Sequence, residues 1–205
     1  LQANACEIFT DVDGVYTTDP RILPEARQVA QISYDEMLEL ASLGAGVMHN
    51  RSIEFAKKFD VPIRVRSSFS DAKGTMIVAE PESKSSAVSG AALTRNEARL
   101  TIQKVSDQPG TSYEIFKRLA DKKIDVDMIV QNIGADGLAN ISFTVPENEL
   151  KQTLSGLEEA RSVVKAAGIT TDKNVAKVSV VGLGMSEQTG VAHQMFKAIA
   201  QAKVN

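Results

Sequence analysis

The stretch RLTIQKVSDQPGTSYEIFKRLADKKIDVDMIVQNIGADGLANISFTV, residues 99–145, decides the fold of the second half of the chain. The apolar side chains within residues 100–105 predict a strand. A Pro-Gly turn follows, and residues 111–122 carry apolar side chains on one helical face. Two further strands are expected at 126–133 and 141–145, separated by an Asp-Gly turn. The stretch therefore predicts a strand, a helix and a pair of strands, in that order.

The residues that follow complete this pattern. Pro146, with Glu147 and Glu149 after it, fits the first turn of a helix that continues to about Val164. Residues 175–181 predict one more strand. The resulting order, βαββαβ, is that of a ferredoxin-like unit.

The first helix of this unit recurs 80 residues further along the chain. When Gly110 is set against Gly190, five later positions carry the same or a similar residue in both helices: Phe116 and Phe196, Lys117 and Lys197, Leu119 and Ile199, Ala120 and Ala200, Lys123 and Lys203. Agreement at one offset favours an internal repeat. We therefore assign 99–174 to a first unit and 175–205 to the start of a second. The chain has no initial Met and stops directly after the second helix, so we expect it to be a fragment of a longer protein.

The N-terminal residues, 1–79, predict a different α/β domain. An apolar strand at 6–12 runs into an Asp-Gly turn, and Ser33 with Glu36 forms a capping box at a helix start. A second helix is expected with Asn50 as its N-cap, followed by a strand at 61–65. Alternating helices and strands favour a mostly parallel sheet. The polar residues after 79 predict a linker over 80–98.

Composition excludes several classes of protein. The 205 residues are 43% hydrophobic and 24% charged, as expected of a folded globular chain, and the net charge of −3 offers no attraction for nucleic acid. The single cysteine, Cys6, which we expect in the core, allows no internal disulfide and favours a reducing compartment, the cytoplasm. No apolar run approaches the roughly 20 residues that span a membrane, so we expect no membrane partner.

A polar loop directly follows the first predicted strand, where α/β sheets place their ligands. It reads TDVDGVYTTDPR, residues 10–21. An EF-hand is excluded, because Gly14 stands at loop position four and Ile22 stands where the bidentate Glu belongs. A strand ending in Asp-x-Asp-Gly also resembles the nucleophile motif of haloacid-dehalogenase-type phosphatases, with Asp11 as nucleophile and Asp13 as acid/base. That family needs a later acidic cluster for Mg²⁺, which the sequence lacks. A hairpin rich in turn-forming residues remains the non-functional alternative.

The same loop closely resembles the nucleotide-binding segment of aspartate kinases, within the amino-acid kinase family. The resemblance continues through SYDEMLELA (33–41), RSIEFA (51–56) and VPIRVRSSF (61–69). Further on, VSDQPG (105–110), DMIVQN (127–132) and VSVVGLGM (178–185) resemble the regulatory ACT domains of that family. The resemblance implies the end of an amino-acid kinase domain, then one ACT domain and the start of a second.

The resemblance implies phosphoryl transfer from ATP, accompanied by Mg²⁺, to the side-chain carboxylate of aspartate. The residues at matching positions that would contact the nucleotide are Thr10, Asp11, Tyr16, Arg21, Lys73 and Gly74. Tyr16 can cover a base, and the two cations can offset phosphate charge. The family's Lys-Phe-Gly-Gly-Thr-Ser segment, which supplies a catalytic lysine, is missing from this sequence. We therefore assign no catalytic residue and no metal ligand to it, and expect no activity from it alone.

The ACT resemblance implies a site for a free amino acid, lysine or threonine. The residues at matching positions are Asp107, Gly110, Ser112, Asp125, Asp127 and Gln131. A helix start offers N–H groups to the ligand's carboxylate, and acidic or amide oxygens can accept from its ammonium group. ACT units also have a sheet edge to cover, so we expect a homo-oligomer through them. The alternative is a separate, non-catalytic regulatory subunit that binds the amino acid and a larger catalytic chain.

Overall fold

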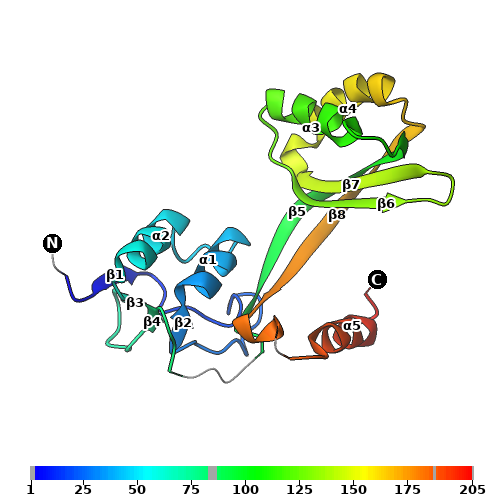
Figure 1. Ribbon diagram of the computed structural model, residues 1–205. Coiled ribbons are helices and arrows are strands. Elements are labelled where there is room, and N and C mark those ends of the chain that lie inside the picture. The colour runs from blue at the N-terminus through cyan, green and yellow to red at the C-terminus, as the bar shows by residue number, and fades with distance from the viewer. Residues whose placement is uncertain (1–2, 83–86, 187, 205) are drawn as a thin grey trace. The chain divides into compact units, whose positions relative to one another are not determined.

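The computed structural model describes residues 3–82, 87–186 and 188–204. Two compact units divide the chain: Leu1–Leu93 with Val178–Asn205, and Thr94–Lys177. Each unit has a sheet of its own (Figure 1). Each also has its own hydrophobic core. The mixed α/β fold class expected from the sequence is confirmed.

The first unit contains a four-stranded sheet in the order β1-β3-β4-β2. Its strands are β1 (Cys6–Thr10), β2 (Gln31–Ser33), β3 (Ile63–Ser67) and β4 (Thr75–Val78). Two of the neighbouring pairs, β1–β3 and β2–β4, are parallel, and β3–β4 is antiparallel, so the sheet is mostly parallel as predicted. Cys6 is exposed, which makes its predicted place in the core wrong, because β1 turns that side chain to solvent at the strand's first residue.

Two helices of the first unit pack on each other, and their apolar faces enter its core. Helix α1 (Tyr34–Ser42) begins at the predicted capping box, in which the Ser33 and Glu36 side chains each bind the other residue's backbone N–H. Helix α2 (Asn50–Phe59) begins one residue before the predicted position. Its N-cap is His49, because the imidazole Nδ1 accepts from the Arg51 amide at 3.2 Å.

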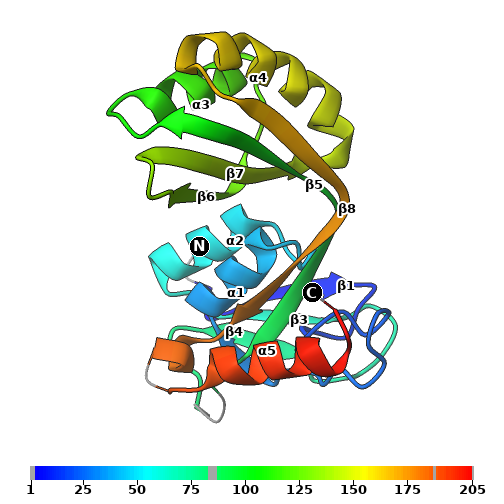
Figure 2. The same ribbon diagram turned by 90° about the vertical axis from the view of Figure 1, so that its right-hand side faces the viewer.

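The second unit has the predicted βαββαβ order. Its elements are β5 (Gly90–Ser106), α3 (Thr111–Asp121), β6 (Asp127–Ile133), β7 (Leu138–Pro146), a short 3₁₀ turn (Glu147–Glu149), α4 (Leu150–Val164) and β8 (Gly168–Val181). The sheet order β6-β7-β5-β8 is the ferredoxin-like arrangement. Helices α3 and α4 lie side by side over one face of the sheet (Figure 2). Strand β5 begins at Gly90, inside the range predicted as linker, while 83–86 of that range lie outside the described residues.

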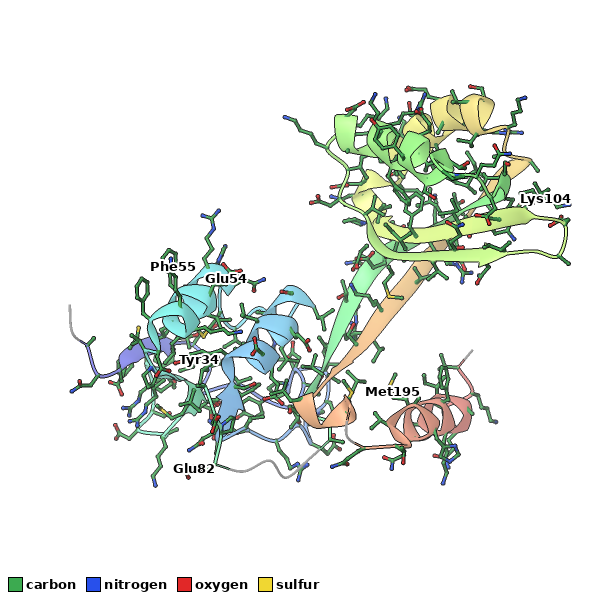
Figure 3. The ribbon with its side chains drawn as sticks, in the orientation of Figure 1. Tyr34, Glu54, Phe55, Glu82, Lys104 and Met195 are labelled. Atoms are coloured by element: carbon green, nitrogen blue, oxygen red, sulfur yellow. The ribbon has the colours of Figure 1, made fainter. Side chains whose placement is uncertain are left out.

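The repeat reappears as two helices at equivalent positions. Helix α3 starts at Thr111 and α5 (Val191–Gln201) starts at Val191, 80 residues later. Each follows a left-handed glycine, Gly110 with φ 97° and Gly190 with φ 96°. Their surroundings differ, because α3 buries Ile115 and Leu119 whereas no described residue of α5 is buried. Figure 3 draws the side chains of α5 and labels Met195 among them.

Candidate functional site

The carboxyl ends of two parallel strands meet at one edge of the first sheet. Thr10 ends β1 directly opposite Ser67, the end of β3, and the Ser68 amide donates to the Thr10 carbonyl at 2.8 Å. The Thr10 hydroxyl donates to Asp11 Oδ1 at 3.0 Å, and Asp11 is exposed. The structure thus places these two predicted residues at the sheet edge where ligands of α/β proteins bind.

Thr75 joins the polar loop to the turn that precedes β4. Its buried hydroxyl accepts from the Val15 amide at 2.8 Å and donates to the Val29 carbonyl at 2.6 Å. Gly14 is needed beside it, because a Cβ at that position would lie 2.6 Å from the Thr75 hydroxyl. The sequence reasoning missed this role. Nothing in the local pattern links Thr75 to a loop 60 residues earlier.

Tyr16 and Arg21 each have an acidic partner within the same loop. The Tyr16 hydroxyl donates to Asp13 Oδ1 at 2.9 Å, and this bond, with burial and the negative charge of Asp13, raises the pKa of Tyr16. The Arg21 side chain is 88% exposed and binds Asp19, with Nη2 and Oδ2 2.8 Å apart. Arg21 is therefore held locally at the surface, where a ligand anion can reach it.

Lys73 and Gly74 line a pocket of about 410 Å³ whose other lining residues are Ala30, Gln31, Arg64 and Met76. Gly74 has φ +74°, and a Cβ there would lie 2.1 Å from the Val65 carbonyl oxygen, so only glycine fits. Thr10, Asp11, Tyr16 and Arg21 are not among the residues that line this pocket. The six predicted nucleotide contacts thus fall into two groups, which Thr75 connects through the Val15 amide.

Three of the six predicted effector residues form one hydrogen-bonded cluster in the second unit. Gln131 donates from Nε2 to Asp107 Oδ1 at 2.9 Å, and its Oε1 accepts from the Ser112 hydroxyl at 3.3 Å. All three are partly or fully exposed. We call Asp107, Ser112 and Gln131 the effector cluster. It offers a carboxylate, an amide and a hydroxyl to a small polar ligand.

Gly110 lies at the start of α3, beside the effector cluster in sequence. It is the N-cap residue and has no side chain with which to bind the first N–H groups of the helix. A Cβ at Gly110 would meet nothing within 4 Å, so open space adjoins this residue. Such a helix start is suited to a carboxylate.

Asp125 and Asp127 lie apart from the cluster. A bulge in β6, with Met128 at φ 45°, places Asp127 opposite Thr144 but Gln131 opposite Ile141. Because side chains alternate along β7, Thr144 and the buried Ile141 face opposite sides of the sheet, and so do Asp127 and Gln131. Asp127 instead binds Lys177 of β8, and this bond holds the pKa of Asp127 below its usual value. Asp125 is exposed in the loop before β6.

Lys177 is a contact that sequence reasoning missed, since it lies 50 residues from Asp127. Across residues 3–82, 87–186 and 188–204, no three His, Cys, Asp or Glu side chains are arranged to hold a metal ion. Within the same ranges, no helix is both long and apolar enough to cross a bilayer.

Comparison with known proteins decides the family. Residues 1–67 match the family model described as the amino acid kinase family, and residues 103–160 and 178–205 match that of the ACT domain. The aspartokinase of Helicobacter pylori is 50% identical over the whole chain, which covers 51% of that protein. The crystal structure of aspartokinase alpha and beta subunits contains a chain that is 44% identical to this one. The alignment covers 58% of this chain and 78% of that chain, with a TM-score of 0.53. The chain belongs to the aspartate kinase family.

Solved structures of aspartate kinases show the same fold over most of this chain. The aspartate kinase of Clostridium acetobutylicum aligns over 97% of this chain and 46% of its own, with a TM-score of 0.88 and 26% identity. The structure of E. coli aspartokinase III in complex with aspartate and ADP, an R-state, aligns with this chain at a TM-score of 0.80 and 28% identity. The alignment covers 96% of this chain and 44% of that one. The complex of the same enzyme with lysine and aspartate, a T-state, aligns at a TM-score of 0.70 and 29% identity, over 88% of this chain and 40% of that one. The chain spans about half the length of the curated relatives it matches. The predicted resemblance to aspartate kinases is confirmed.

Proposed function

We propose that this chain serves in an aspartate kinase that transfers a phosphoryl group from ATP to the side-chain carboxylate of L-aspartate. The observation that carries the proposal is the match of 97% of the chain, at a TM-score of 0.88, to a known aspartate kinase. Activity needs the segment with the family's catalytic lysine, so we expect it only in a protein that also has that segment. ATP and aspartate are cytoplasmic metabolites, and we place the reaction there.

In this proposal the polar loop and the turn before β4 bind the nucleotide. Thr10 and Asp11 lie at the sheet edge, Tyr16 covers the base, and Arg21, Lys73 and the Gly74 backbone approach the phosphates. Phosphoryl transfer demands that charge on the transferred group be offset, and the exposed cations Arg21 and Lys73 can supply that charge. Mg²⁺ would arrive with the nucleotide, and we assign it no ligand in this chain.

Arg21→Ala in the complete enzyme tests the nucleotide site. Loss of one charge-assisted hydrogen bond weakens ATP affinity or transition-state binding by about 1–3 kcal/mol. Arg51→Ala, which removes another exposed arginine, is the matched control and is expected to behave like the parent. Steady-state kinetics against ATP provide the measurement. ATP kinetics equal to the parent's would show that Arg21 does not contact the nucleotide.

We also propose that the ACT unit binds lysine, threonine or both, as a feedback effector. The E. coli T-state complex contains lysine, which supports an amino acid as the ligand class. In the effector cluster, Asp107 can pair with the ammonium group, Gln131 and Ser112 can bind polar atoms, and the helix start at Gly110 can hold the carboxylate. Asp125 and Asp127 are candidates for contacts from outside the cluster.

Two variants of the complete protein separate these roles. Gln131→Ala should weaken amino-acid binding about tenfold, because it removes the residue that links Asp107 with Ser112. If Asp127 also contacts the effector, Asp127→Ala relieves feedback with nearly unchanged uninhibited turnover. If Asp127 does not reach the effector because it lies on the other face of the sheet, Asp127→Ala weakens amino-acid binding less than Gln131→Ala does. Calorimetric titration with lysine and threonine, singly and together, distinguishes the two, and no binding to the parent protein would refute the effector site.

A separate regulatory subunit is the second candidate function. It is favoured by one observation, the coverage of 78% of a chain in the structure of aspartokinase alpha and beta subunits. The subunit would bind the same amino acids and a larger catalytic chain. The coding sequence preceding Leu1 discriminates: a Lys-Phe-Gly-Gly-Thr segment there makes the protein a full enzyme, and a start codon next to Leu1 makes it a subunit.

A further inference from the structure

Glu36 is a buried carboxylate that does more than cap α1. It is only 7% exposed, and its two oxygens have different partners. Oε2 accepts from the Ser33 hydroxyl at 2.7 Å and the Ser33 amide at 3.2 Å, which is the local capping box. Oε1 accepts from the Ser89 hydroxyl and from the Leu183 amide at 3.3 Å, which lie 53 and 147 residues away. An ordinary capping box accounts for the first oxygen only.

The charge on Glu36 is retained despite its burial. Burial alone would raise the pKa of this carboxyl, but hydrogen bonds from Ser89, from Ser33 and from the Leu183 amide together hold it below its ordinary value. A buried anion that keeps its charge depends on all its donors, since losing one leaves part of its charge uncompensated. Loss of either remote donor is therefore expected to cost free energy.

Ser89 and Leu183 adjoin the ends of two strands. Ser89 precedes β5, Leu183 follows β8, and the Ser89 amide donates to the Val181 carbonyl at 2.8 Å. Their backbones approach so closely that a Cβ at Gly182 would lie 2.1 Å from the Ala87 carbonyl oxygen. The start of β5 and the end of β8 thus form one junction, which Glu36 fastens to α1.

This junction contacts the proposed nucleotide loop directly. The Ala91 amide, two residues after Ser89, donates to the Thr17 carbonyl at 2.7 Å. A Cβ at Gly90 would lie 3.1 Å from the same carbonyl oxygen and 3.2 Å from Leu40 of α1, so the strand lies closely against both. Thr17 follows Tyr16. The chain of contacts runs from Glu36 through Ser89 and Ala91 to the backbone beside Tyr16.

We propose that Glu36 is a positioning residue that fixes the Tyr16–Thr17 backbone for nucleotide binding by holding the start of β5 through Ser89. This inference rests on the proposed function, because it takes the loop around Tyr16 as part of the ATP site. Glu36 does not touch the nucleotide. Its effect reaches the loop through the bond from Ala91 to Thr17.

The kinetic test compares the remote and the local donor in the complete enzyme. Ser89→Ala removes a hydroxyl from Oε1 and should raise KM for ATP about fivefold or more, the loss expected from one hydrogen bond to a charged group. The kcat value and KM for aspartate should stay within about twofold, because the chemical groups are untouched. Ser89→Thr keeps the hydroxyl and should restore the parent KM. Ser33→Ala removes the local donor and should lower thermal stability without this rise in KM.

A second measurement needs no catalysis. The Ala91 amide, protected by the Thr17 carbonyl, should exchange its hydrogen at least about tenfold faster in Ser89→Ala but not in Ser33→Ala. An active parent with unchanged Ala91 exchange and unchanged KM for ATP in Ser89→Ala overturns the inference and leaves the proposed function standing. An equal KM rise in Ser33→Ala also overturns it, since the effect would then come from a loosened α1. A parent without kinase activity overturns the proposed function, and Ala91 exchange alone then decides the role of Glu36.

Discussion

At the scale of single residues, contacts with the backbone decide which side chains the first unit accepts. Gly74 lies against the Val65 carbonyl, while Gly46, in the loop after α1, has open space where a Cβ would be. Both are glycines in turns, and the sequence alone does not separate them. The difference arises because the fold brings β3 against Gly74, whereas nothing lies near the Cβ position of Gly46.

Gly74→Ala should therefore destabilise the protein by about 2–4 kcal/mol, because it combines a positive φ with a collision against main-chain atoms that cannot rotate away. Gly46→Ala is the matched control and should change stability by less than about 1 kcal/mol. Chemical denaturation of both variants measures the difference. Equal stabilities would contradict the backbone contact at Gly74.

Glu36 gives a prediction about pH. Its pKa in the folded protein lies below its ordinary value of 4.5, so folding favours the charged form. The stabilisation is complete above pH 4.5 and is lost as the pH falls through the lowered folded pKa. Glu36→Gln should lower the free energy of unfolding at pH 7 by about 1–3 kcal/mol and flatten its dependence on pH below 4.5. Urea titrations across that range check this, and parallel curves for parent and variant would refute it.

The capping box itself was predictable, because Ser33 and Glu36 are three residues apart and the bond is local. Its second half was not, since Ser89 and Leu183 are brought to Glu36 only by the folded chain. The same holds for Thr75, whose partners are 46 and 60 residues away. Local spacing is enough to predict a cap, whereas contacts between residues far apart in the sequence can be predicted only when the topology of the fold is known.

At the scale of elements, β6 shows where pattern reading stops. The strand at 126–133 was expected from its apolar side chains, and β6 occupies nearly that range. The bulge at Met128 was not expected, because a non-glycine residue at φ 45° leaves no mark in the sequence. One extra residue exchanges the faces of the strand, and this is why Asp127 and Gln131, four positions apart, face opposite sides.

Strand β6 is also an edge strand with exposed apolar side chains. Met128, Ile129, Val130 and Ile133 are all exposed, and among the strands that the structure describes only β7 flanks β6. Such an edge pairs readily with another strand, so we predict that a second copy of the chain covers it. Ile129→Lys should weaken self-association about tenfold or more, whereas Val163→Lys, an equally apolar exposed position on α4, should not. Light scattering across a concentration series measures both, and a parent that stays monomeric at high concentration contradicts the prediction.

At the scale of the whole molecule, the 80-residue repeat yields two helices with unequal support. Phe116 of α3 lies edge-on to Phe143, with ring centroids 5.6 Å apart, while its counterpart Phe196 of α5 is 68% exposed. The pattern of the repeat was predictable from the aligned residues. The packing of the two helices was not predictable, because the apolar face of a helix does not indicate which strands are present to cover it.

In the 205-residue chain, amide hydrogens of α5 should therefore exchange faster than those of α3, by about a hundredfold or more. Helix α3 can open only with the core of its unit, whereas α5 can unfold without exposing a buried side chain. Mass spectrometry of exchange in peptides from 111–121 and 191–201 provides the measurement. Similar protection in both would show that α5 is covered, for instance by a second copy.

Strand β5 has a consequence for how this family can vary in length. It runs without a loop from Ala91, which binds the Thr17 carbonyl, to Ser106, whose carbonyl accepts the Thr111 hydroxyl at the start of α3. Side chains of β5 alternate on either side of the bulge between Ile102 and Val105, so one further inserted residue would turn every later side chain of the strand to the other face. The turn at Gly134–Gly137, by contrast, can gain or lose residues at little cost. Insertions and deletions among natural relatives are thus expected to spare β5 and to gather in that turn.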